Sequence, residues 1–242
     1  MIKIRAFRPL DESELCLEYI DGHRRVLEDY GIINITSYNK DWITNPFVFG
    51  VYAEQDGVMV GAIRIQIADG IHPLPVEAAV GKMDPKVYDL VTKHRLDGGT
   101  GELCGLWNAK SVAGRGISIL LVRAAISIIN QLEFRTLLGI CGPYSLDMFT
   151  RVGFVIDKTL GNKGDFIYPT PEYIAYVLGI MDARTLSTSL PFDRDRMLLL
   201  RSQPKQTLIE TGPKGDLEVH YELKVPAQKS DTLVSQTIIN NK

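Results

Sequence analysis

The sequence predicts a mixed α/β (α+β) fold, with helices flanking a mostly antiparallel central sheet and a C-terminal helix and hairpin as an appendage. One observation is the pair of β-rich runs at 47–54 and 58–68, joined by Gln55-Asp56-Gly57. An Asp-Gly pair between such runs is a strong hairpin signal. The other is a single strand–loop–helix–strand unit over 101–154. One crossover unit beside a hairpin is unlike the regular alternation of doubly wound proteins.

The first part of the chain is predicted to contain one strand and two helices. Residues 3–8 alternate polar and apolar side chains and predict a strand, and a helix follows from about 11 to 30, with Gly22 as a weak point. Residues 31–46 are expected to form a loop or a short helix that contains Trp42. A further helix is predicted over 85–95, where Asp84 would cap it and Pro85 would occupy its first turn.

The central stretch is the strongest pattern in the sequence. An apolar strand over 102–109 leads into a loop that holds Gly114 and Gly116, and a strongly apolar helix begins directly after it. A strand over 136–141, a short helix over 144–151 and a strand over 155–157 follow. Small residues before a helix let a phosphate approach backbone N–H groups at the positive end of the helix dipole. The alternative is a simple turn, since glycine loops of this kind occur in many α/β proteins.

The remainder of the chain is predicted to be a separate part. Residues 1–170 are expected to form the main domain, and 171–242 an appendage that would act as a lid or a dimer-forming arm. Within it we expect an amphipathic helix over 171–183, a solvent-facing mixed-charge helix face at 193–196 and a terminal hairpin over 208–225. The last residues, 227–242, are expected to fray.

Composition excludes several classes of protein. The net charge is −2, which gives no reason to expect nucleic acid as a partner. The three cysteines are scattered, no Cys/His group has the spacing of a zinc site, and no apolar run could span a bilayer. The N-terminus lacks the apolar core of a secretory signal, so a cytoplasmic location without a resident metal is expected.

These residues carry a resemblance to the GNAT acyltransferase superfamily. The positions of the family's loop motif hold Ala113, Gly116 and Ser118, and the family's Gly-Phe ending appears as Gly153-Phe154. Ala113 replaces the usual Gln or Arg, with Arg115 nearby as a substitute charge, and Phe149 replaces the usual Tyr. The resemblance implies acyl-CoA, acetyl-CoA by default, as co-substrate. It also implies a set of donor-binding residues: Asn108, Ala109, Gly114, Arg115, Gly116, Ile117 and Ser118.

A second resemblance is to long-chain relatives within that group, the autoinducer synthases and N-acyl amino acid synthases. It rests on Gly61 followed by Arg64, and on Leu74-Pro75-Val76-Glu77. It implies that Arg64 contacts the acceptor, and that an acyl carrier protein is an alternative donor. Trp42 is expected to pack at the edge of the core, and lining the acceptor pocket is the alternative.

Acyl transfer to an amine requires a base for the amine and an acid for the departing thiolate. Glu102, at the start of the central strand, is the first candidate for the base and Glu77 the second. Because Phe149 carries no hydroxyl, Tyr144 and Ser145 are the candidates for the acid. A surface charge for Glu102 and a helix cap for Ser145 are the structural alternatives.

Three functions follow. The first is an N-acyltransferase in which an amine of a small molecule or peptide attacks the thioester directly. The second is a long-chain synthase supplied by acyl carrier protein. The third, favoured by Ala113 and Phe149, is an acyl-CoA-binding protein without catalysis. A serine hydrolase is disfavoured because no Gly-x-Ser-x-Gly motif occurs.

Overall fold

One mixed sheet runs through the whole structure, a computed structural model that describes residues 1–29, 31 and 40–226. Within those residues ten strands form the sheet in the order β6-β8-β5-β4-β3-β2-β1-β10-β9, and β7 also pairs with β8. The strands are β1 (Ile2–Phe7), β2 (Val48–Gln55), β3 (Val58–Ile67), β4 (Thr100–Asn108), β5 (Thr136–Cys141), β6 (Val155–Ile156), β7 (Asp165–Ile167), β8 (Ile174–Ile180), β9 (Lys205–Gly212) and β10 (Gly215–Glu222).

Two neighbouring pairs, β4 with β5 and β1 with β10, are parallel, and the other pairs are antiparallel. The predicted hairpin of β2 and β3 is present, with Asp56 and Gly57 at positive φ in its turn. The predicted crossover unit is also present, because α4 joins the parallel strands β4 and β5. The predicted fold class is therefore confirmed.

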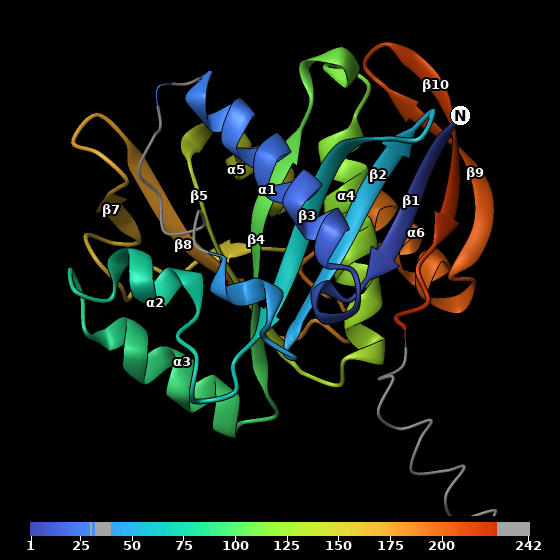
Figure 1. Cartoon of the computed structure of the whole chain (residues 1–242). Helices are drawn as coiled ribbons and strands as arrows, with labels where there is room; N and C mark the ends of the chain where they lie inside the picture. The colour runs from blue at the N-terminus through green and yellow to red at the C-terminus, as the bar shows by residue number, and fades with distance from the viewer. Residues whose placement is uncertain (30, 32–39, 227–242) are drawn as a thin grey trace, which may run out of the picture.

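Helices cover both faces of the sheet (Figure 1). They are α1 (Ser13–Glu28), α2 (Pro75–Val80), α3 (Lys86–Leu96), α4 (Ile117–Ile128), α5 (Pro143–Arg151) and α6 (Pro191–Ser202). In Figure 1, α1 crosses the face nearest the viewer and α4 lies behind the sheet with α6 beside it. The apolar side of α4 is buried against β1–β4, and Phe149 of α5 belongs to the same core cluster. Among the described helices none is long and apolar enough to cross a membrane.

The helix predicted over 171–183 is wrong, because this segment contains β8, which pairs with β5, β6 and β7. Ala175, Val177 and Leu178 are buried. A strand buried on both faces carries a continuous apolar run, which cannot be told from a buried helix by periodicity.

The end of the chain also differs in part from expectation. The mixed-charge segment 193–196 does lie on a helix, α6, but Asp193 is fully buried instead of facing solvent. The terminal hairpin is present as β9 and β10, and β10 extends the central sheet by pairing with β1. The division of the chain at residue 170 stays a prediction, and the tail at 227–242 lies outside the described residues.

The weak point expected at Gly22 is absent, since α1 is continuous from Ser13 to Glu28. Glycine serves packing here: an ideal Cβ on Gly22 would lie 2.2 Å from Cη2 of Trp107 on β4. The missing side chain lets α1 approach the sheet closely.

Candidate active site

The central sheet opens between β4 and β5. Their parallel pairing runs from Thr100 and Thr136 to Leu103 and Gly139, and no described strand pairs with that edge of β4 beyond Leu103. Just past this point β4 has a bulge opposite β3, where Gly105 adopts φ +65°. Backbone groups along this edge of β4 are therefore available to a ligand.

A cavity of about 230 Å³ lies at the opening. Leu106 and Phe149 reach it from the side covered by α4, whereas Pro75 reaches it from the side of α2. The cavity is thus lined from both faces of the sheet. Its remaining walls come mainly from the start of α5 and from the β7–β8 turn, including Tyr144, Ser145, Tyr168 and Tyr173.

Glu102 is a fully buried carboxyl group beside this cavity. One oxygen, Oε2, accepts the backbone N–H of Val76 at 2.7 Å, while Oε1 has no hydrogen-bond partner among the described residues. Its neighbours on β4, Leu103 and Cys104, line the cavity. Burial raises the pKa of Glu102 to about 8, although the Val76 N–H and the charge of Arg64 act in the opposite direction. The group therefore exchanges its proton near neutral pH.

Arg64 on β3 is a buried cation close to Glu102. Its side chain is 2% exposed, and neither Nε nor Nη1 has a hydrogen-bond partner in the described part of the chain. The guanidinium lies 4.8 Å from the ring centroid of Trp42. Trp42 itself is buried and covers Arg64 in this way, and it is not among the residues that line the cavity.

Tyr19 of α1 completes this buried polar group. Its hydroxyl donates to the carbonyl of Gly105 at the β4 bulge and its ring packs against Trp42. His23, one turn further along α1, has its pKa lowered to about 3 by burial and by the nearby Arg64, so its ring is neutral. α1 thus holds the bulge in place from the face of the sheet that it covers.

Glu77, the second candidate base, has a structural task. Its Oε2 accepts the N–H of Leu74 at 2.7 Å and caps the start of α2. Burial raises its pKa, with the Leu74 hydrogen bond opposing that effect. The same short helix supplies the Val76 N–H that holds Glu102, so Glu77 supports Glu102 through α2.

The loop before α4 has open backbone groups at the helix start. Gly114 and Gly116 have φ of +77° and +80°, and no side chain caps the helix. The first N–H groups of α4 are therefore free of side-chain partners, as an anion site requires. Lys214, in the β9–β10 turn, crosses this loop: its Cε is 2.8 Å from where a Cβ on Gly114 would be.

The other predicted donor residues support the loop. Ser118 donates its hydroxyl to Oδ1 of Asn108, which joins the end of β4 to the first turn of α4. Arg115 Nη1 donates to Gln55 at 2.9 Å. The N–H of Ala109 donates to the carbonyl of Val60 at 2.8 Å, so it is not available to a ligand. Ile117 is buried beneath the loop.

The acid candidates lie at the start of α5. Ser145 and Tyr144 both line the cavity, and the Ser145 hydroxyl donates to the Gly142 carbonyl at 3.3 Å. Phe149 is in the cavity wall, packed edge-on against Phe154. Tyr168 and Tyr173 were not predicted as site residues, and they bring two further phenol groups to the cavity. Tyr173 was expected within the helix over 171–183, and this prediction left out the β7–β8 hairpin whose turn carries both residues.

A family model for the acetyltransferase (GNAT) family matches residues 13–154, more than half of the 242-residue chain. The chain belongs to this family. The matched region contains the β4–β5 opening, the α4 loop and the start of α5. Membership of the GNAT family implies an acyl-CoA co-substrate and identifies the chain as an N-acyltransferase.

Solved structures share the fold of this GNAT protein at low sequence identity. FeeM, an N-acyl amino acid synthase from uncultured soil microbes, aligns with TM-score 0.60 and 14% identity over 78% of this chain and 96% of its own. BjaI, a CoA-dependent acyl-homoserine lactone synthase, aligns with TM-score 0.55 and 12% identity over 98% of this chain and 100% of its own. An acyl-CoA N-acyltransferase from Pseudomonas aeruginosa aligns with TM-score 0.52 and 10% identity over 74% of this chain and 99% of its own.

No curated protein matches the chain by sequence. The structural likenesses show a shared fold, and the resemblance to the synthases expected from the sequence is present at that level. Of the predicted site residues, the structure gathers Glu102 and Arg64 beneath the opening, Tyr144 and Ser145 in the cavity wall, and Gly114–Ser118 at the start of α4. Among the described residues, no three His, Cys, Asp or Glu side chains form a metal-binding group.

Proposed function

We propose that this GNAT enzyme transfers an acyl group from acyl-CoA to a primary amine of a small molecule or peptide by direct attack. The observation that carries the proposal is Glu102: a buried carboxyl group beside the β4–β5 opening, with one oxygen free and its pKa raised to about 8. A carboxylate that titrates near neutral pH is suited to take a proton from an attacking amine.

The start of α4 suits the phosphates of the donor. The uncapped N–H groups and the positive φ of Gly114 and Gly116 provide an anion cradle, with Lys214 and Arg115 as nearby cations. Acyl-CoA supplies the activated thioester. A donor held at this loop would extend along the free edge of β4 toward the cavity, where backbone N–H groups of β4 can orient the acyl carbonyl.

Glu102 acts on the other side of the opening. Since Glu102 is not among the residues that line the cavity, it is proposed to receive the amine proton through a water molecule. The acid for the departing thiolate is proposed to be Tyr144 or Ser145, with Tyr168 and Tyr173 as further hydroxyl groups in the same wall. Proton transfer at each position contributes typically about 10²–10⁴-fold to the rate.

The cysteines favour direct attack over an acyl-enzyme. Cys104 and Cys141 both line the cavity, and burial raises the pKa of each thiol to about 12. A thiol nucleophile acts as its thiolate, which is scarce at neutral pH for such groups.

A second candidate is synthesis of an N-acyl amino acid or a related product, with a carboxylate-bearing acceptor and a long-chain donor on CoA or acyl carrier protein. Arg64 favours the carboxylate, because it is a buried cation with unpaired N–H groups. It is not among the residues that line the cavity, so it would attract an acceptor carboxylate through its charge and not by direct contact. The cavity volume of about 230 Å³ favours a short acyl group, since sites for drug-sized ligands span roughly 300–1,000 Å³.

The test is an assay of thiol release and product mass across donors from acetyl-CoA to dodecanoyl-CoA and acyl carrier protein, with amino acids and simple amines as acceptors. We expect turnover with acetyl-CoA, and a loss of about 10²–10⁴-fold in kcat for Glu102→Gln. Glu77→Gln is the matched comparison and should cost far less. A gain along the chain-length series would support the synthase. Donor binding without turnover by any acceptor would replace both proposals with a binding protein.

A further inference from the structure

Helices α4 and α5 each follow one of the two strands that separate at the opening. α4 follows β4 and begins at the loop of Gly116, whereas α5 follows β5 and places Ser145 in the cavity wall. Both helices pack on the same face of the sheet, where Leu121 and Phe149 share one core cluster. Their separation therefore fixes the position of the loop relative to the cavity.

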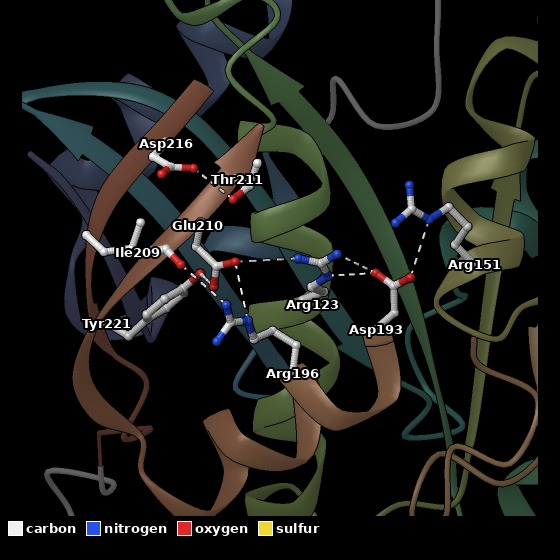
Figure 2. Close-up of polar contacts among 9 residues, drawn as sticks. All are labelled: Arg123, Arg151, Asp193, Arg196, Ile209, Glu210, Thr211, Asp216 and Tyr221. Atoms are coloured by element: carbon white, nitrogen blue, oxygen red, sulfur yellow. Dashed lines mark hydrogen bonds and ion pairs between the residues drawn. The ribbon is translucent and has the colours of Figure 1, made fainter. Parts of the chain in front are cut away.

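A single buried carboxylate bridges these helices. Asp193, in the first turn of α6, is fully buried. Its Oδ1 accepts from Nε and Nη2 of Arg123 on α4, at 2.7 and 2.5 Å. Its Oδ2 accepts from Nε of Arg151, the last residue of α5, at 3.3 Å. Figure 2 shows Asp193 between the two guanidinium groups.

The start of α6 is also fastened to the end of α5 without this carboxylate. The N–H of Leu190 donates to the Arg151 carbonyl at 2.9 Å, and the Ser189 hydroxyl donates to the Val152 carbonyl at 2.7 Å. Gly153 leaves room for this contact, because a Cβ there would lie 2.6 Å from Ser189 Oγ. Further along, α6 is also fastened to α4, because Ser127 donates to the Met197 carbonyl and Arg201 donates to the Ile126 carbonyl. What the Asp193 side chain adds is a carboxylate that α4 and α5 share directly, at the end of α6 nearest to α5.

A second buried carboxylate in the same network provides a comparison. Glu210 on β9 lies 3.7 Å from Arg123 and 3.4 Å from Arg196 of α6, and its Oε1 accepts from the Tyr221 hydroxyl at 3.1 Å (Figure 2). Glu210 thus shares Arg123 with Asp193 but has no contact with α5 among the described residues.

We propose that Asp193 is a positioning residue for acyl transfer. It would set the separation of α4 and α5, so that a donor held at the α4 loop presents its thioester at the β4–β5 opening. This inference rests on the proposed function. Misplacing a reacting group by about 1 Å can lower the rate about 10²-fold. A link that sets the distance between the two helices beside the donor can therefore change kcat.

Three variants test the proposal: Arg151→Gln, which shortens the side chain and removes its charge, and the isosteric changes Asp193→Asn and Glu210→Gln. The Arg151 side chain is 44% exposed, so its variant is expected to fold even if Asp193→Asn does not. For Arg151→Gln and Asp193→Asn we expect kcat to fall by about tenfold or more. The dissociation constant for CoA, measured by calorimetry, should stay within about twofold, because the phosphate loop is intact.

Glu210→Gln should lower Tm but keep kcat within about twofold of the parent value. The double variant Arg151→Gln/Asp193→Asn should lose no more kcat than Asp193→Asn alone, because both changes remove the same link. Unchanged kcat in folded Arg151→Gln, or an equal loss in Glu210→Gln, would overturn the proposal. Amide hydrogen exchange over residues 147–151 of α5, measured without donor, separates this from the proposed function, because these N–H groups have intrahelical partners and lie at the end of α5 that Asp193 holds. Arg151→Gln should accelerate that exchange whether or not the enzyme transfers acyl groups, and unaltered exchange would also overturn the proposal.

Discussion

Replacing Gly22 by alanine should destabilise the protein, although alanine is the better helix former. An ideal Cβ at this position lies 2.2 Å from Cη2 and 2.3 Å from Cζ2 of Trp107. Carbon atoms in contact prefer about 3.5–4.0 Å, so the indole or α1 must move by more than about 1 Å. Trp107 is 5% exposed and packed in the core cluster of α1, which leaves no direction for an easy shift.

The two effects can be weighed. Overpacking a core costs about 1–3 kcal/mol, and a contact this short belongs at the upper end. Removing glycine from a helix interior recovers about 1 kcal/mol. The net loss is about 2 kcal/mol, which lowers Tm by about 4–8 °C for a protein of this size. Urea unfolding and calorimetry measure both quantities.

The exposed neighbour Glu18 isolates the helix term, since Glu18→Gly should be about 1 kcal/mol less stable than Glu18→Ala. Combining Gly22→Ala with Trp107→Leu should make the two changes less harmful together than their sum. If Gly22→Ala proved as stable as the parent protein, the close packing of α1 on β4 would be incorrect.

Three further predictions concern the site. Gly116→Val should weaken CoA binding at least tenfold, whereas Gly57→Val, with the same φ of +80° but in the β2–β3 turn, should leave it unchanged in calorimetry. Burial raises the pKa of Glu102 from 4.5 to about 8, so the folded state retains a proton that the unfolded chain loses between those values. The free energy of unfolding of the parent protein should therefore fall as pH rises from about 4.5 to 8, and that of Glu102→Gln should not. Urea unfolding at a series of pH values measures both, and the same pH dependence in the two proteins would contradict this. Incubation with acyl-CoA alone should give no mass adduct on Cys104 or Cys141, because both are neutral thiols. A stable acyl adduct would instead indicate a two-step reaction.

Much of the fold was accessible from local pattern. The β2–β3 hairpin, the strand–loop–helix order of β4 and α4, and the terminal hairpin all carry turn residues or strong periodicity next to the element itself. The segment of β8 lacks such a marker. Ile174, Val177 and Leu178 have helical spacing only because neighbouring positions are apolar as well, which a strand covered on both faces permits.

The site was less accessible, because its chemistry depends on long-range contacts. Glu102 could be named as a base candidate from its place on the central strand, but its burial and its bond to Val76 depend on the position of α2. Asp193 looks like a surface charge beside Arg194 and Asp195, since its partners Arg123 and Arg151 are remote in sequence. Charge and hydrophobic periodicity can be taken from the sequence alone. Which charged side chain becomes buried depends on elements that are remote in sequence.

The pairing of β1 with β10 has a consequence for how the protein is made. Ile2 lies opposite Val219, so β1, which is synthesised before the other described strands, gains its second neighbour only when nearly all of the described chain has been made. Until then β1 has β2 on one side and a row of unpaired N–H and C=O groups on the other, which is a template for pairing with another chain. Contacts of such long range also slow folding. Nascent or truncated chains that end before β10 should therefore be the most aggregation-prone species of this protein, and crowded synthesis should make them dependent on chaperones.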